Sequence, residues 1–284
     1  MVTHHPDSDL CHCVEKIVPQ VSETLIVDNG SSASCVDQLK RISERLGAHL
    51  ILNSANEGLV RAINQGAQSA VSRGYQWILM LDQDTTVAPD MVESLGEIVR
   101  SDPHAQRLAV VGSNFKDKVT GRLSTTVTAI TCGSLVSLSV FQALGGLRDD
   151  FFIDCVDHEY CLRARAHGFR VIITSRALME HPIGNFTYHR FLGRTVRTTN
   201  HAPLRQYFMA RNLLILIREY ARKEPRFIYA YCGGYLRAAI KLCLFEDGRL
   251  AKIKSIVRGC LDGVLRRTTR QQAKISPPDK SPTL

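Results

Sequence analysis

The stretch LIVDNGSS, residues 25–32, decides the fold. An apolar, β-branched run stops at Asp28, and the asparagine, glycine and serines behind it form a turn that is able to cap a helix. This order of strand, loop and helix recurs along the first half of the chain. It predicts an α/β protein whose mixed, mainly parallel sheet carries helices on both faces.

Working outward, apolar runs predict further strands at 48–52, 77–81, 108–112, 131–137 and 169–174, and helical spacing predicts helices at 58–72, 89–100 and 155–166. Asp28 and Asp82 each stand at the carboxyl end of a strand. Ligands of parallel sheets bind at these ends. We therefore expect the two carboxylates to line one crevice.

The composition fits an ordinary globular protein. The 284 residues are 44% hydrophobic and 22% charged, enough for one large domain or two modest ones. The nine cysteines include no C-x-x-C pair, and the first residues lack the basic end and apolar run of a signal peptide. We expect a reduced, cytoplasmic protein with neither a zinc site nor a disulfide framework.

Charge is unevenly distributed. Residues 1–185 hold 16 Lys and Arg against 21 Asp and Glu, whereas residues 186–284 hold 20 against 6. A basic half suggests an anionic surface partner, either nucleic acid or the cytoplasmic face of a membrane. No nucleic-acid motif is present and no G-x-G-x-x-G follows a strand, which disfavours both a nucleic-acid-binding protein and a dinucleotide dehydrogenase. No apolar stretch reaches the roughly 20 residues of a membrane span.

Two acidic segments at strand ends are candidates for chemistry. Asp82-Gln83-Asp84 offers two carboxylates on a strand-to-loop turn, a compact oxygen donor set for Mg²⁺ or Mn²⁺. Its ordinary alternative is a solvated loop or a helix cap. Asp28 can contact a nucleobase or ribose, or serve as a helix N-cap, a role that Ser31 or Ser32 already satisfies.

A third acidic cluster opens the helix expected at 155–166. Asp157, beneath apolar and aromatic residues, is a candidate general base. The alternative is that Asp154, Asp157 and Glu159 are first-turn acids that favour the positive end of the helix.

Seven segments together resemble the family 2 glycosyltransferases, and most closely their bacterial rhamnosyltransferase branch, which transfers rhamnose from dTDP-rhamnose. They are LIVDNGSS (25–32), NEGLVRAINQG (56–66), WILMLDQDT (77–85), TCGSLVS (131–137), FFIDCVDHEYCLRARAHGF (151–169), HPIG (181–184) and ARNLLIL (210–216). The resemblance implies a GT-A fold with a C-terminal helical extension and an inverting transfer. It also implies a place in polysaccharide biosynthesis such as that of O-antigen.

The resemblance assigns roles by position. Asp157 is the general base, with Glu159 as the fallback. A D-x-D-bound Mg²⁺ or Mn²⁺ has Asp84, Asp82 and His181 as its ligands. Contacts to the nucleotide sugar or acceptor fall on Thr3, Asp28, Asn29, Asn56, Arg61, Asp82, Gln83, Gly133, His181 and Arg211. A structural histidine is the alternative for His181, and an ordinary surface helix position is the alternative for Arg211.

The chain departs from the family pattern at its start. Family members open with a full strand, of which only Val2-Thr3-His4-His5-Pro6 remains here. We expect an exposed sheet edge and an opened nucleobase pocket. The expectation has two explanations, a start codon assigned too late or a compromised protein. The alternative function is accordingly a degenerate GT-A domain that binds a nucleotide sugar or glycan without turnover.

The resemblance gives the basic half a use, since such enzymes often act on lipid-linked glycans. We expect a GT-A domain at 1–200, a basic helical region at 201–270 and a disordered tail at 271–284. The basic helices suit a peripheral contact with the inner face of the cell membrane. A helical subdomain that closes the acceptor side or forms a homodimer contact is the alternative.

Overall fold

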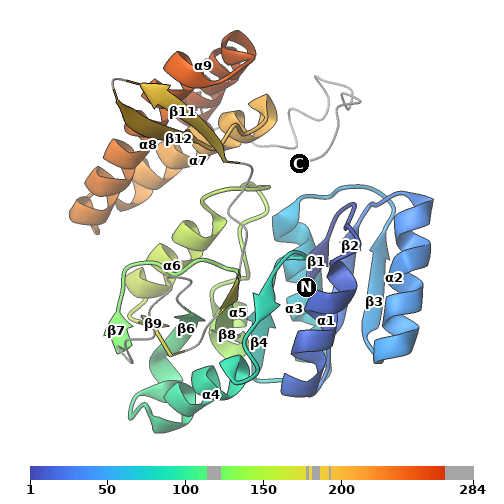
Figure 1. The fold of residues 1–284 in the computed structure, drawn as a ribbon. Coiled ribbons are helices and arrows are strands. Elements are labelled where there is room, and N and C mark those ends of the chain that lie inside the picture. The colour runs from blue at the N-terminus through green and yellow to red at the C-terminus, as the bar shows by residue number, and fades with distance from the viewer. Residues whose placement is uncertain (114–122, 177–178, 181–185, 192, 266–284) are drawn as a thin grey trace. The chain divides into compact units, whose positions relative to one another are not determined.

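The computed structural model describes residues 1–113, 123–176, 179–180, 186–191 and 193–265 (Figure 1). The chain divides into two compact units. Unit 1 comprises Met1–Asp149 and Val156–Pro182, and unit 2 comprises Asp150–Cys155 and Ile183–Leu284. The short loop 150–155, inside the expected 1–200 domain, thus groups with the C-terminal helices. The expected tail at 271–284 lies outside the described residues.

Unit 1 begins with the β-α-β-α-β pattern predicted from the sequence, with one more helix ahead of it. The elements are β1 (Val2–Thr3), α1 (Leu10–Ile17), η1 (Val18–Gln20), β2 (Leu25–Asn29), α2 (Ala33–Leu46), β3 (His49–Asn53) and α3 (Leu59–Ser72). The three strands are parallel in the order β1-β2-β3. Ile26 packs among side chains of α1 and α2, whereas Val27, which points to the opposite face, lies against Gly66 of α3. Helices therefore cover both faces.

The second half of unit 1 carries a five-stranded sheet in the order β4-β8-β6-β9-β7. Its elements are β4 (Trp77–Met80), β5 (Thr86–Val87), α4 (Met91–Ser101), η2 (Ala105–Arg107), β6 (Leu108–Ser113), β7 (Leu123–Thr125), β8 (Ser134–Ser137), α5 (Leu138–Ala143), α6 (Val156–Ala166), β9 (Arg170–Thr174) and β10 (Met179–Glu180). A parallel bridge from Val2 to Asp82 joins β1 to the end of β4. The two sheets therefore continue one another.

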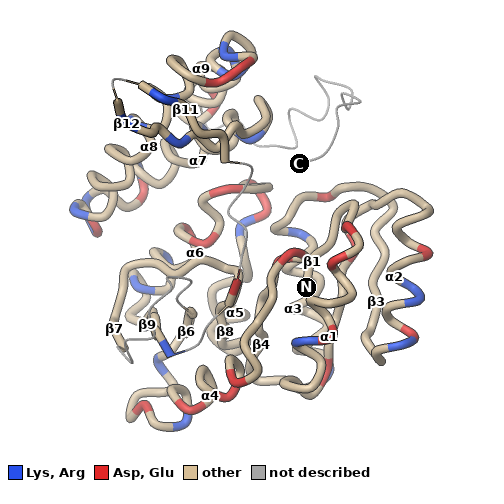
Figure 2. The backbone as a smooth tube through the Cα atoms, viewed as in Figure 1, with Lys and Arg blue, Asp and Glu red and all other residues tan. Residues whose placement is uncertain are grey.

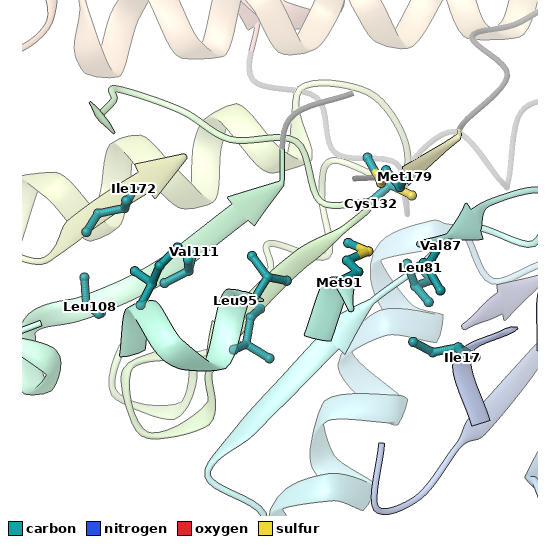
Figure 3. Packing of buried hydrophobic residues seen from close by; sticks show 12 residues of the cluster. Ile17, Leu81, Val87, Met91, Leu95, Leu108, Val111, Cys132, Ile172 and Met179 are labelled. Atoms are coloured by element: carbon teal, nitrogen blue, oxygen red, sulfur yellow. The ribbon is translucent and has the colours of Figure 1, made fainter. Parts of the chain in front are cut away.

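Strand direction follows from the pairings. Strands β4 and β6 are both antiparallel to β8, β6 is parallel to β9, and β7 is antiparallel to β9. Only β8 and β7, among the strands described in these two sheets, run against the common direction. Figure 3 shows the core on one face, where Met91 and Leu95 of α4 pack with Leu108 and Val111 of β6.

The described residues of unit 2 form a hairpin and three helices. They are β11 (Thr187–Phe191), β12 (Arg194–Thr198), α7 (Pro203–Tyr220), α8 (Pro225–Phe245) and α9 (Arg249–Leu265). Helices α7 and α9 lie close together because α9 presents glycines. A Cβ at Gly259 would come within 2.3 Å of the Tyr207 carbonyl oxygen, and one at Gly263 within 2.9 Å of the Arg211 oxygen. Within the part of the chain that the structure describes, no helix has the length and apolar character needed to cross a bilayer.

Candidate active site

The end of β1 links the carboxyl ends of β2 and β4. Thr3 donates a hydrogen bond from Oγ1 to Asp28 Oδ1 at 3.0 Å, and the backbone nitrogen of His4 donates to Gln83 Oε1 at 2.8 Å. Val2 bridges to Asp82. The structure thus brings Thr3, Asp28 and the Asp82-Gln83 turn to one end of the sheet, as the strand pattern predicted.

Asp28 is buried and held from several sides. Besides the Thr3 hydroxyl, its carboxylate accepts the backbone N–H of Ser31 at 2.9 Å and the Ser31 hydroxyl. The turn that permits this requires glycine, because Gly30 has a φ of +82° and a Cβ there would lie 2.4 Å from the backbone of Ala55. Ser32 occupies the N-cap of α2 without a side-chain capping bond, so the cap that the sequence predicted for this residue is not made. Asp28 is fixed before any ligand arrives.

An amide cluster holds the loop that follows β3. Asn29 donates from Nδ2 to Asn56 Oδ1 at 3.0 Å and accepts the backbone N–H of Glu57 at 3.0 Å. Asn56 Oδ1 also accepts the N–H of Gly58 at 2.9 Å. Arg61, in the first turn of α3, pairs with Glu57 near the surface. These predicted contact residues therefore lie together on the loop and helix next to Asp28.

The Asp82-Gln83-Asp84 turn leaves its second acid at the surface. Asp84 is exposed and Asp82 half-buried, while Thr85 is buried with its hydroxyl 3.0 Å from Cys132 Sγ. Cys13 lies beneath this turn, where burial, with a contribution from Asp84, raises the pKa of its thiol. Burial likewise lowers the pKa of His4 below its usual value, which suits a neutral imidazole whose Nδ1 donates to the Asn29 carbonyl.

Gly133 lies directly behind the turn. Its N–H donates to the Met80 carbonyl at 2.8 Å, and a Cβ at its φ of +72° would lie 2.3 Å from Met179 Sδ. The third predicted metal ligand, His181, lies outside the described residues. In the ranges that are described, no group of three or more His, Cys, Asp and Glu is arranged to hold a metal ion.

The two candidate bases at the start of α6 differ sharply in their surroundings. The Glu159 side chain is 2% exposed, and Arg163 donates to both of its oxygens at 3.0 Å, with Arg148 at 3.8 Å. The Asp157 side chain is 21% exposed, and its Oδ1 accepts the N–H of His158 at 2.8 Å. Glu159 is committed to a buried ion pair, which leaves Asp157 as the accessible carboxylate.

Asp157 also approaches the strand that bears the D-x-D turn. It lines a small cavity together with Met80 of β4, Thr131 and Tyr160. Burial raises the pKa of the Tyr160 hydroxyl well above its usual value and that of the Cys161 thiol to about 12, so neither ionises here near neutral pH. Asp157 thus contributes the carboxylate on this wall of the cavity.

The location of Arg211 differs from the surface position that the sequence left open as an alternative. It is buried on α7, and its Nη1 donates to the Asp150 carbonyl at 2.7 Å and to Asn212 Oδ1 at 2.8 Å. The alternative of an ordinary surface position is therefore wrong, and a diphosphate contact stays a prediction. Asn212, which sequence reasoning missed, binds the same loop. Its signal was its place beside Arg211 in ARNLLIL.

A second opening lies between β2 and β4. This cavity, of about 280 Å³, is lined mainly by apolar side chains, including Leu25, Ile63 and Leu79. Met1 stands at its edge, where its amino group donates to the Leu25 carbonyl at 2.8 Å. Burial lowers the pKa of that amino group to about 6. Strand β1, next to this opening, has two residues.

Comparison with known proteins identifies the family. The family description "Glycosyl transferase family 2" matches residues 1–166. The chain belongs to this family. It is 28% identical over 240 residues to "dTDP-rhamnosyl transferase RfbF" of Shigella flexneri, covering 77% of this chain and 79% of that protein. This family 2 glycosyltransferase is thus similar to a rhamnosyltransferase over most of its length.

Solved structures give the fold. The mannosyltransferase PcManGT of Pyrobaculum calidifontis, in complex with GDP-Man and Mn²⁺, superposes with a TM-score of 0.59 at 12% identity, over 94% of this chain and 86% of that one. GalNAc-T7 with UDP, GalNAc and Mn²⁺ gives 0.60 at 13% identity, over 98% of this chain. The chain spans 57% of the GalNAc-T7 chain. The predicted GT-A fold is confirmed.

Proposed function

We propose that this glycosyltransferase moves rhamnose from dTDP-rhamnose to a hydroxyl of a cell-surface glycan or lipid-linked acceptor, with inversion at the anomeric carbon. The similarity to a dTDP-rhamnosyl transferase over 77% of the chain supports this donor. The observation that carries the proposal is the junction at β1, where Thr3 binds Asp28 and Val2 bridges to Asp82. One end of the sheet thus presents groups for both halves of a nucleotide sugar.

In the proposed reaction, the acceptor hydroxyl attacks the anomeric carbon from the face opposite the leaving group. The new C–O bond forms as the bond to the diphosphate oxygen breaks, and Asp157 takes the hydroxyl proton. General bases of this kind typically contribute about 10²–10⁴-fold to the rate. Asp157 suits the role because its carboxylate is accessible, whereas Arg163 holds both oxygens of Glu159.

The donor nucleoside would lie along the end of β2. Asp28 is already oriented by Thr3 and Ser31, so it can accept a hydrogen bond from the base or ribose without further ordering. Asn29 and Asn56 fix the adjoining loop. Arg61, which pairs with Glu57 near the surface, would contact an anionic part of the donor.

A divalent cation fits the D-x-D turn. Asp82 and Asp84 supply carboxylate oxygens, the donor type that Mg²⁺ and Mn²⁺ prefer, and Asp84 is exposed. When bound, such an ion neutralises charge on the departing diphosphate. The residues would hold either metal, with His181 as a proposed further ligand.

The test is a panel of nucleotide sugars, assayed by thermal shift and by product formation with and without Mn²⁺ or Mg²⁺. A ligand that binds only the native state raises its apparent stability. We expect dTDP-rhamnose to give the largest shift and release dTDP when an acceptor is present. If a different nucleotide sugar stabilises the protein and dTDP-rhamnose does not, that sugar replaces dTDP-rhamnose as the proposed donor.

The second candidate function is a domain that binds the nucleotide sugar without turnover. The cavity between β2 and β4 favours this alternative, because a sheet with space between these strands can hold Asp28 for binding without holding the transition-state geometry. Calorimetry that measures dTDP-rhamnose binding, with no dTDP released over a panel of lipid-linked acceptors, would establish it.

We also propose that unit 2 meets an anionic membrane surface. Lys and Arg recur along its helices (Figure 2), and α8 exposes Leu236, Ile240 and Leu244 beside Arg237 and Lys241. Co-sedimentation with anionic vesicles should be lost in an Arg237→Glu, Lys241→Glu variant. If the wild type does not co-sediment with these vesicles and elutes as a dimer in size-exclusion chromatography, the helices form the homodimer contact instead.

A further inference from the structure

The loop 150–155 adopts an unfavourable backbone conformation. Phe152, Asp154 and Cys155 have φ angles of +56°, +62° and +59°, in the left-handed region that side chains other than glycine rarely enter. Three such residues within four positions do not persist by local preference. Contacts outside the loop must hold them.

Asn212 supplies the central contact. It is fully buried on α7, and its Nδ2 donates to three loop carbonyls, those of Phe151 at 3.0 Å, Ile153 at 2.9 Å and Asp154 at 2.9 Å. Its Oδ1 accepts from Arg211, whose guanidinium also binds the Asp150 carbonyl. The hydrogen bonds of a single side-chain amide therefore fix the loop backbone over the four residues from Phe151 to Asp154.

The same helix grips the side chains of the loop. Arg205 donates from Nε and Nη2 to the Asp154 carboxylate at 3.1 to 3.2 Å. Phe208 stacks on Phe152 with ring centroids 5.0 Å apart. Positions 205, 208 and 212 share one face of α7, because residues three and four apart on a helix are neighbours. This face of α7 thus binds the loop. Arg205 and Phe208 contact its side chains, and Asn212 bonds to the loop backbone.

The loop leads straight into the helix that carries Asp157. Cys155 is its last residue, α6 begins at Val156, and Asp157 is the second residue of α6. The backbone angles at Asp154 and Cys155 therefore determine how the chain enters the first turn of α6. Asn212 lies beyond residues 1–166, to which the family description applies.

We propose that Asn212 is a positioning residue, which fixes the left-handed path of loop 150–155 and through it the aim of the Asp157 carboxylate. This inference rests on the proposed function, in which Asp157 is the base. Displacing a reacting group by about 1 Å can cost roughly 10²-fold in rate. Loss of the amide should therefore slow the transfer while leaving donor binding unchanged.

The experiment compares Asn212→Leu with a matched control. Leucine keeps the approximate size of asparagine and removes its donors. The control is Gln20→Leu, because Gln20 is also an amide with three backbone partners, donating to Lys16 and Ala88 and accepting from Val92. The measurements are kcat, the dissociation constant of dTDP-rhamnose, and amide hydrogen exchange of residues 150–155.

We expect Asn212→Leu to lower kcat about 10- to 100-fold, with a donor dissociation constant within about twofold of wild type and faster exchange in the loop. Gln20→Leu should lower stability alone. Adding Cys155→Gly to Asn212→Leu should recover part of kcat, because glycine adopts a positive φ without strain. Equal kcat in Asn212→Leu and Gln20→Leu, or no recovery with glycine, overturns the positioning role.

Two further outcomes are distinguishable. If Asn212→Leu does not fold, Asn212→Ser keeps one donor and should show a smaller loss of kcat with the same recovery. If wild type turns over no donor at all, the proposed function fails and the positioning role falls with it. Hydrogen exchange of the loop then still reports whether Asn212 holds its backbone.

Discussion

The two ends of the parallel strands in unit 1 have very different surroundings. At the carboxyl ends of β2 and β4, Asp28 accepts a hydrogen bond from Thr3, the last residue of β1, and Gln83 accepts one from His4, which follows it. Towards the amino ends the same strands border an apolar cavity of about 280 Å³, with the Met1 amino group at its edge. Native interiors rarely leave such space.

The difference between the two ends indicates that one end serves the reaction and the other serves stability. A few residues at the end of β1 suffice to arrange the polar end, because Thr3 binds Asp28, Val2 bridges to Asp82 and the backbone N–H of His4 binds Gln83. The apolar end depends on side chains that would fill the space between β2 and β4, and it contributes to stability through burial. Changes at the exposed acid of this end, Asp84, should therefore affect turnover and leave stability alone, and changes at the cavity should do the opposite.

The largest expected effect is that of Asp84→Ala. A bound metal supplies several kcal/mol of transition-state stabilisation, and each factor of ten in rate corresponds to about 1.4 kcal/mol. We expect turnover to fall about 10³-fold or more, with the melting temperature unchanged because Asp84 is exposed. Asp37→Ala, which removes an exposed acid from α2, is the control. Full activity of the Asp84 variant would remove this residue from the proposed metal site.

Asp157→Asn should follow, with a loss of about 10²–10⁴-fold in kcat and retained binding of dTDP-rhamnose. The neighbouring Glu159→Gln should show the reverse pattern. It leaves Arg163 without its buried carboxylate, so we expect a loss of about 1–3 kcal/mol in unfolding free energy. Stopped turnover in Glu159→Gln with unchanged stability would exchange the two roles.

Asp28→Asn should have a more moderate effect. Hydrogen bonds to a charged group are worth about 1.5–3 kcal/mol, so the KM of dTDP-rhamnose should rise about 10- to 100-fold while kcat changes little. Ser31→Ala, which removes one of the donors to Asp28, should raise KM less. An unchanged KM in Asp28→Asn would place the nucleoside elsewhere.

The sequence was informative where local pattern determines structure. Asp28 and Asp82 were predicted at strand ends because an apolar run visibly stops at each. Helix α1 was missed although Leu10, Cys13, Val14 and Ile17 are buried at helical spacing. The β11–β12 hairpin was missed for a different reason. Most of its residues, Tyr188 and Phe191 among them, are exposed, so it has no buried face to leave an apolar signature.

Contacts between distant segments could not be predicted in this way. The interactions of Arg211 and Asn212 join α7 to a loop about 60 residues earlier, and no spacing along the chain encodes that meeting. The contrast between Asp157 and Glu159 is only partly of this kind. Both are acids in the first turn of α6, and Arg163 follows Glu159 by four residues, a spacing that the sequence does show. The approach of Arg148, from a segment before α6, is what the sequence could not show.

The smallest expected effect concerns the cavity end. The pKa of the Met1 amino group is lowered from 8.0 to about 6 in the folded chain, so the unfolded chain binds more protons between those values. The contribution of this amino group to stability should then rise as pH increases from 6 to 8 and be flat below 6. Urea unfolding midpoints across this range measure the effect, and acetylation of the amino group should abolish it.

A four-residue apolar extension ahead of Met1 sharpens the same comparison. Val2 lies opposite Val27 of β2 and bridges to Asp82, so residues placed before Met1 would run beside β4 from Met80 back to Trp77. Valines there should fill the cavity, replace the buried amine with a peptide bond and raise the melting temperature by a few degrees. A Gly-Ser extension of equal length is the control, since it removes the amine without filling the space. If both extensions stabilise the chain equally, the amine and not the empty volume is what weakens this end of the sheet.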